Sequence, residues 1–135
     1  MAFSKTFHLF SAVDGIVLMG GKPVQGVEVL QDYSWHWTDE KARNVTRTDA
    51  NGRYQFPAIM GRSFSGSLLP HEPVVEQRLQ FVWQGKTYQG WYHSKHNYDE
   101  LGELGGKPLR LVCDLSEEPI ARPEIGSSGI CALQP

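Results

Sequence analysis

The sequence predicts an all-β protein, an antiparallel β-sandwich of about seven strands. Three observations carry this prediction: apolar residues alternate with polar ones or form short runs, no long stretch has helical spacing, and Gly, Pro, Asn or Asp signals separate the runs. The chain of 135 residues has room for one domain with a single core. A domain of this length buries about two-thirds of its unfolded surface, so its folding requires neither a metal nor a disulfide.

The expected strands are residues 16–19, 24–30, 44–48, 53–56, 64–69, 76–83, 87–93 and 109–115. Two segments have weaker patterns. Residues 32–43 fit a long loop or a strand with a short helical turn, and residues 95–106 fit one helical turn before the last strand. We therefore expect a sandwich domain over 1–115 and an irregular C-terminal tail over 116–135, which is either disordered or draped over the sandwich.

The segment TDANGRYQF contains the clearest turn. Asn51-Gly52 is a strong hairpin signal because both residues tolerate positive φ. Asp49 can cap the turn by accepting backbone N–H bonds. Tyr54 and Phe56 are two residues apart, so they point to one face of the next strand and supply large apolar area to a core. The polar residues of this segment are therefore interpreted as a turn, not as a catalytic or metal site.

Residues 14–59 resemble the transthyretin-like (prealbumin) and carboxypeptidase regulatory-like sandwich families. The matching features are Gly15, the turn Gly21-Lys22-Pro23, the pair Gly26-Val27, and the Thr48-Asp49 hairpin with Gly52, Tyr54 and Phe56. The chain departs from the family pattern after Ile59. The resemblance implies a sandwich, and it leaves function open because such folds carry many activities. Small bacterial proteins with this half-match resemble accessory genes beside contact-dependent secretion systems, including type VI secretion.

Composition excludes several classes of partner. The net charge is −2 and the 13 Lys and Arg residues are spread along the chain, so no basic footprint for nucleic acid exists. No apolar segment approaches the length that spans a bilayer, and the N-terminal apolar run is interrupted by His8, Ser11 and Asp14. We therefore expect a soluble, cytoplasmic protein. Cys113 and Cys131 could pair, but two free thiols are the expectation for that compartment.

Enzymatic sites are weakly supported. The same hairpin resembles that of intradiol dioxygenases, but the chain lacks their His-x-His pair. It also lacks the C-terminal Tyr-Arg-Gly-Ser of hydroxyisourate hydrolases. His93 and His96 form the one close histidine pair, and a metal there would need further ligands. Those candidates are His71, Glu72, Asp99 and Glu100. Lys95 between the two histidines opposes a cation, and Cys113 has no motif of a nucleophile. We predict no catalytic residue, metal or cofactor.

The aromatic residues of YSWHW suggest a binding surface. In an extended chain Tyr33, Trp35 and Trp37 share one face, opposite His36. Core packing is the common role of Trp on a sandwich strand, but charged neighbours surround this segment, and aromatic anchors with a polar rim are typical of protein-binding patches.

The sequence thus predicts a non-catalytic protein-binding module, an accessory, adaptor or immunity protein whose partner is a toxin or secretion component. Its main patch is Tyr33, Trp35, His36 and Trp37, and a second patch is His93, His96 and Tyr98. A homodimer through an edge strand is a further alternative. Two other functions stay open at this point: a metal-dependent enzyme using His93 and His96, and a carbohydrate-binding sandwich.

Overall fold

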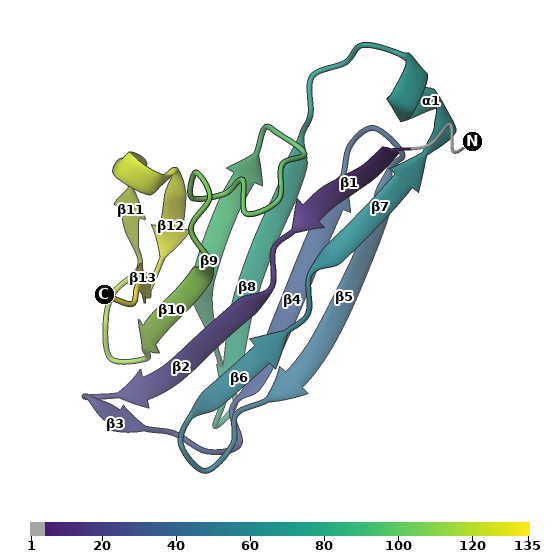
Figure 1. The fold of residues 1–135 in the computed structure, drawn as a ribbon. Coiled ribbons are helices and arrows are strands. Elements are labelled where there is room, and N and C mark those ends of the chain that lie inside the picture. The colour runs from purple at the N-terminus through teal and green to yellow at the C-terminus, as the bar shows by residue number, and fades with distance from the viewer. Residues whose placement is uncertain (1–4) are drawn as a thin grey trace.

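The computed structural model describes residues 5–135 and confirms the all-β sandwich (Figure 1). Two twisted layers of strands face each other. The first layer contains β1 (Lys5–Phe10), β2 (Val13–Met19), β3 (Lys22–Pro23), β6 (Arg53–Phe56), β7 (Ile59–Ser63), β10 (Leu109–Asp114) and β13 (Cys131–Leu133). The second contains β4 (Glu28–Trp35), β5 (Glu40–Arg47), β8 (Val75–Trp83), β9 (Lys86–Lys95), β11 (Ile120–Arg122) and β12 (Ser127–Gly129).

The first layer is built around two long strand pairs that follow one another. β1 pairs with β7, and β2 pairs with β6. The chain runs along the layer through β1 and β2 and returns antiparallel through β6 and β7, with a short break between the strands each time. β10 lies beside β2 in parallel register, from Leu109 opposite Val13 to Asp114 opposite Leu18. This parallel pair departs from the antiparallel arrangement of the other strands described. Parallel neighbours need a long connection, and here most of the chain lies between them.

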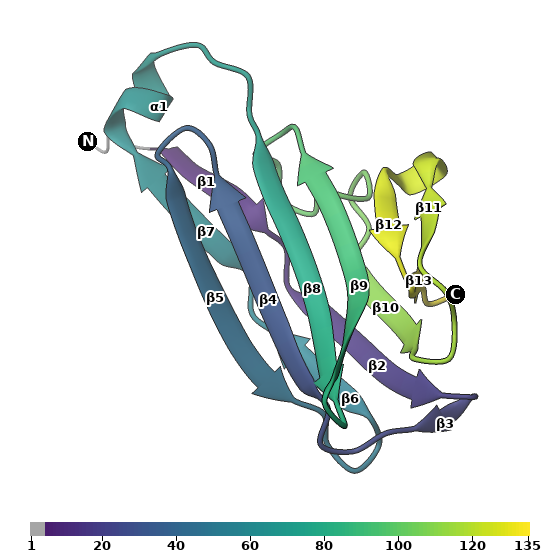
Figure 2. The same ribbon diagram turned by 180° about the vertical axis from the view of Figure 1, so that it is seen from behind.

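The second layer is one antiparallel sheet with the order β11-β12-β9-β8-β4-β5 (Figure 2). Burial alternates along β4 and β8: inward residues such as Val29, Gln31, Leu79 and Phe81 are buried, and their neighbours face outward. β5 forms one edge of this sheet. No helix in the described part of the chain covers the outer face, as Figure 2 shows.

The core lies between the layers in two clusters. The larger one gathers apolar side chains of both sheets, including Val17, Tyr54, Phe81, Trp91 and Leu111. The smaller one contains Phe7, Leu9, Trp35 and Val75 at the end of the molecule near α1 (Phe64–Leu68).

The turn at Asp49 to Gly52 has the predicted cap but not the predicted topology. Asp49 Oδ1 accepts hydrogen bonds from the backbone N–H groups of Asn51 (2.8 Å) and Arg53 (2.9 Å). Gly52 has φ +74°, whereas Asn51 is not among the residues with positive φ. The turn joins β5 to β6, which belong to different sheets. It is an arch between layers, so the predicted hairpin was wrong.

Residues 64–68 form the short helix α1, where a strand over 64–69 was predicted. Ser63 Oγ accepts a hydrogen bond from Gly66 N–H (3.0 Å), which caps the first turn of α1. Phe64 and Leu68 are four residues apart and both are exposed. The other uncertain segments resolve into a β4–β5 hairpin closed at 36–39 and a series of turns over 99–106.

The C-terminal tail is draped over both layers, which was one of its two predicted alternatives. It consists of short strands and irregular stretches: β13 pairs with β10, and β12 pairs with β9. Cys113 and Cys131 lie directly opposite each other on β10 and β13 and form a buried disulfide. The expectation of two free thiols was therefore wrong. Across the described residues, no helix has the length and apolar character needed to cross a bilayer.

Candidate functional site

The structure moves Trp35 out of the predicted binding patch and into the core. Its side chain is 1% exposed and packs with Phe7, Leu9 and Val75. Tyr33 is half-buried, and its hydroxyl donates to Glu40 Oε2 (2.7 Å). Only His36 of the main patch is well exposed, near the carboxylate of Glu76 (3.6 Å). The predicted patch therefore does not exist as a continuous surface, because Trp35 completes the core at the end of β4.

Three predicted residues nevertheless meet at one place, together with His71. The Tyr98 hydroxyl accepts a hydrogen bond from Trp35 Nε1–H (3.0 Å) and lies 2.6 Å from His71 Nε2. His71 Nδ1 lies 3.0 Å from the Leu69 carbonyl, which can only accept, so Nδ1 carries a proton. In the neutral imidazole, Nε2 then accepts from the Tyr98 O–H. Burial raises the pKa of Tyr98, and the bond from Trp35 opposes that rise.

Trp37 completes this group, which we call the aromatic end cluster (Trp35, Trp37, His71 and Tyr98). Its ring stacks on His71 with centroids 3.9 Å apart, and its Nε1–H donates to Ser63 Oγ (3.2 Å). A Cβ on Gly66 would lie 2.9 Å from Trp37 Nε1, so α1 fits closely against this side chain. The polar atoms of the cluster bond to one another, to Ser63 Oγ and to the Leu69 carbonyl. The cluster therefore connects the β4–β5 hairpin, the end of β7 and the segments around His71 and Tyr98, and His71 covers one face of the Trp37 ring.

His93 and His96 do not converge. His93 is buried and its Nδ1 lies 2.8 Å from the Gly126 carbonyl, whereas His96 is exposed and contacts Glu72 Oε1 (3.1 Å). Within residues 5–135, no group of three or more His, Cys, Asp and Glu side chains could hold a metal ion. The second predicted patch is thus divided: His93 holds the tail and Tyr98 belongs to the aromatic end cluster. The geometry does not support the metal-dependent enzyme.

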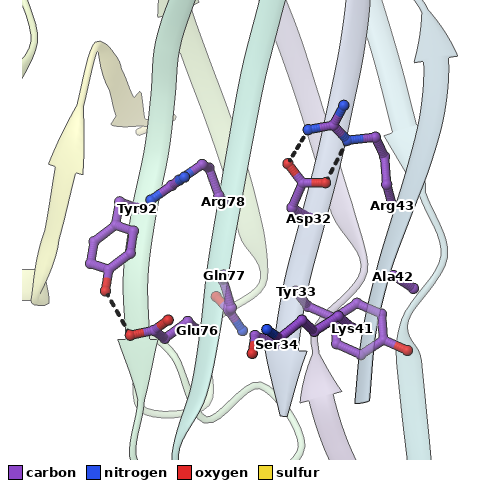
Figure 3. A pocket seen from close by; sticks show the side chains of 10 residues that line it. All are labelled: Asp32, Tyr33, Ser34, Lys41, Ala42, Arg43, Glu76, Gln77, Arg78 and Tyr92. Carbon is purple, nitrogen blue, oxygen red and sulfur yellow. Dashed lines mark hydrogen bonds and ion pairs between the residues drawn. The ribbon is translucent and has the colours of Figure 1, made fainter. Parts of the chain in front are cut away.

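A polar groove crosses the outer face of the second sheet (Figure 3), and of its lining residues only Tyr33 was among the predicted site residues. Its volume is about 480 Å³. The residues that line it are Asp32, Tyr33, Ser34, Lys41, Ala42, Arg43, Glu76, Gln77, Arg78 and Tyr92. The register places Arg43, Asp32, Arg78 and Tyr92 side by side on four adjacent strands. Their outward alternation was visible in the sequence, but only strand register brings them into one row.

Charged pairs organise the floor of this groove. Arg43 donates two hydrogen bonds to the Asp32 carboxylate, from Nε to Oδ1 (2.7 Å) and from Nη2 to Oδ2 (3.1 Å). The Arg78 guanidinium lies 5.5 Å from the centre of the Tyr92 ring, and the Tyr92 hydroxyl donates to Glu76 Oε1 (3.2 Å). Burial raises the pKa of Tyr92, as does Glu76, while Arg78 lowers it. Arg78 and Tyr92 also line the neighbouring hollow under β11 and β12, so the polar surface continues across the sheet.

The groove opens at β5, the long edge of the sheet. All eight residues of β5 are exposed except Thr46, which is half-buried. Lys41, Arg43, Val45 and Arg47 share the outer face, and Val45 is 55% exposed. β5 contains no Pro or Gly, and its register with β4 is unbroken from Arg47 to Glu40. The opposite edge, β11, has only three residues.

The fold and this surface define an all-β sandwich with a long, uncovered sheet edge beside a polar groove. The chain belongs to the family described as Domain of unknown function (DUF6795), whose model matches residues 13–118. That match includes β5 and every residue of the groove, while β1 and the β11–β13 tail lie outside it. Neither a curated protein nor a solved structure matches the chain significantly.

Proposed function

We propose that this protein is a non-catalytic binding module that recognises another protein through β5 and the adjoining outer face. The observation that carries the proposal is the eight-residue edge strand, exposed along its length. An edge strand leaves every second backbone N–H and C=O without a partner in its own sheet. Another chain can pair with these groups and so extend the sheet.

The details of β5 leave backbone pairing open along most of its length. Proteins usually block an edge with charged side chains, a short strand, a Pro, a bulge, inward-pointing charges or a covering segment. β5 is regular and eight residues long, and it has neither a Pro nor a bulge. Its inward charge is Glu40 at one end, and its outward charges are all cations, which select among partners. Backbone bonds along β5 would supply affinity, and the adjacent groove would supply side-chain specificity.

The partner class remains the one expected from the family resemblance: a toxin or secretion component, as in type VI secretion, with this chain as an accessory or immunity protein. Compartment is part of this proposal. The cytoplasm is the compartment expected from the sequence, whereas the Cys113–Cys131 disulfide is more typical of an oxidising compartment. Acid-trapping of thiols in intact source cells, followed by mass spectrometry, measures which state the protein has there.

The test is site-specific photo-crosslinking in source-cell lysate. A benzophenone amino acid replaces Val45 on β5, and a matched variant carries it at Met60 on β7 of the other layer, where the side chain is 49% exposed. The proposal predicts one stoichiometric protein adduct from position 45 and none from position 60. Adducts from position 60 alone, or no adduct from either position, would contradict it.

A further inference from the structure

We propose that β5 accepts a strand from a different protein, that this strand is acidic at alternate positions, and that β5 does not pair with a second copy of this chain. The inference rests on the proposed function and specifies its partner. It follows from the charges on the outer face of β5, where Lys41, Arg43 and Arg47 alternate with Val45.

An incoming strand meets these cations first. Side chains directly opposite each other in an antiparallel pair lie about 5 Å apart on the same face. Arg43 and Arg47 are paired with Asp32 and Glu28, but those carboxylates belong to β4, on the far side of β5 from the newcomer. Both arginines are more than half exposed. Their ion pairs are surface pairs, so the nearest fixed charges that a new strand meets on the outer face are positive.

Antiparallel pairing of two β5 strands is unfavourable in every register that pairs five or more of their residues, because each such register places cations opposite each other. A two-fold axis normal to the sheet keeps outward side chains outward, so only residues of the same face can oppose each other. An antiparallel pair centred on Ala42 puts Lys41 opposite Arg43. One centred on Arg43 puts two Arg43 side chains opposite each other.

The remaining registers have the same defect. A pair centred on Asn44 puts Lys41 opposite Arg47, and one centred on Val45 puts Arg43 opposite Arg47. Every such register that pairs five or more residues of β5 therefore sets cation against cation, which destabilises the pair. Parallel pairing of two β5 strands is not related by a two-fold axis normal to the sheet, so it does not give the symmetric dimer that most homo-oligomers form.

A complementary strand can be written down from the same positions. Reading antiparallel to β5, it has an acidic residue opposite Arg47, an apolar residue opposite Val45, and acidic residues opposite Arg43 and Lys41. The residues between them meet Thr46, Asn44 and Ala42, which are uncharged. The pattern acid-x-apolar-x-acid-x-acid therefore gives three opposite-charge contacts and leaves no cation facing an apolar group.

The experiment uses the full chain and two capped peptides, Glu-Thr-Val-Thr-Glu-Thr-Glu and Lys-Thr-Val-Thr-Lys-Thr-Lys. Amide NMR titration and hydrogen exchange at low salt report where each peptide binds. We expect the acidic peptide to protect amides of residues 40–47 and the basic peptide to leave them unchanged. No protection of β5 at millimolar acidic peptide, or equal binding of the two peptides, would overturn the inference.

Charge-reversal variants test the same contacts from the protein side. Lys41→Glu/Arg43→Glu/Arg47→Glu should weaken acidic-peptide binding by about tenfold or more, since each lost pair contributes a few tenths to about 1 kcal/mol. Lys86→Glu/Lys107→Glu/Arg110→Glu changes the net charge equally at exposed sites away from β5 and should bind as the wild type does. Lys41→Glu alone keeps the test valid if the triple variant misfolds, because Lys41 makes no ion pair among the described residues.

The two proposals fail in distinguishable ways. A partner that crosslinks at position 45 while the acidic peptide leaves β5 unprotected keeps the binding module and removes the acidic pattern. If position 45 gives no adduct and the acidic peptide does not protect β5, both the binding module and the acidic partner strand are refuted. Sedimentation of the wild type should give a monomer, and a dimer with protected β5 amides would contradict the argument from register.

Discussion

At the scale of single residues, Tyr98 connects two elements through one hydroxyl group. Tyr98→Phe leaves the buried Trp35 Nε1–H without its acceptor and His71 Nε2 without its donor. An unsatisfied buried donor costs about 1–3 kcal/mol, so urea denaturation should show a loss of that size. Tyr88→Phe is the control, because the Tyr88 hydroxyl makes no hydrogen bond within residues 5–135. Equal losses in the two variants would show that the Tyr98 hydroxyl does not hold the cluster.

Glu103 sets a pH dependence of stability. Burial acts to raise its pKa, but hydrogen bonds from Ser11 and Gln77 and the charge of Lys95 outweigh burial and lower it. A carboxylate with a lowered pKa stabilises the fold above its usual value of about 4.3, and this contribution is lost as pH falls through the folded pKa.

The measurement is the urea midpoint between pH 6 and pH 3. Glu103→Gln should be less stable than the wild type at pH 6 and should lose less stability on acidification. Glu117→Gln, at an exposed carboxylate, should follow the wild-type curve. Parallel curves for wild type and Glu103→Gln would refute the assignment.

At the scale of elements, the arch from β5 to β6 depends on Gly52. Its φ is +74°, and a Cβ would lie 2.6 Å from the Val17 carbonyl oxygen. Gly85 has nearly the same φ, +75°, with nothing within 4 Å of a Cβ. Gly85→Ala should therefore lower the free energy of unfolding by about 1–2 kcal/mol, which is the penalty of the left-handed backbone alone. Gly52→Ala should lower the stability measured by thermal unfolding clearly more. Equal losses in the two variants would show that the contact between the new Cβ and the Val17 carbonyl oxygen does not destabilise the fold.

The tail depends on the disulfide between β10 and β13. The bond closes a loop with a sequence separation of 18, so Cys113→Ala/Cys131→Ala should destabilise the fold by about 3 kcal/mol. Amides of β12 and β13 should exchange faster in this variant, while β8 keeps its protection. A thiol titration of the unreduced wild type should give no free thiol, and two free thiols would contradict the pairing.

How far the sequence predicts these elements depends on whether the signal is local. Alternation located the strands that became β8, β9 and β10, and the Asp49 cap was predicted correctly. The hairpin was wrong because turn residues specify a reversal of direction but not the sheet that the next strand joins. Residues 64–69 were wrong because a short apolar run fits both a strand and a capped helical turn.

The site was less predictable than the fold for the same reason. Tyr33, Trp35 and Trp37 alternate, but alternation does not say which face is inside. In the structure Trp35 is buried in the core. The row from Arg43 to Tyr92 joins residues from four strands, so it exists only once register is known. The cations of β5 were visible in the sequence, but their position on an open edge was not.

At the scale of the whole molecule, β5 is a long edge of the second sheet that the described strands leave open, and we assign recognition to that edge. Backbone pairing with a partner would order amide hydrogens along the full length of β5. The outward cations select the partner. β11 and β12 of the tail lie at the opposite edge of the same sheet, and β13 with its disulfide belongs to the other layer.

The most direct measurement is amide hydrogen exchange of the protein with and without the partner captured at position 45. We expect residues 40–47 to gain protection as one continuous segment, with smaller changes on the outer face of β4 and β8. Protection confined to the aromatic end cluster, with β5 exchanging as fast as in the free protein, would contradict it.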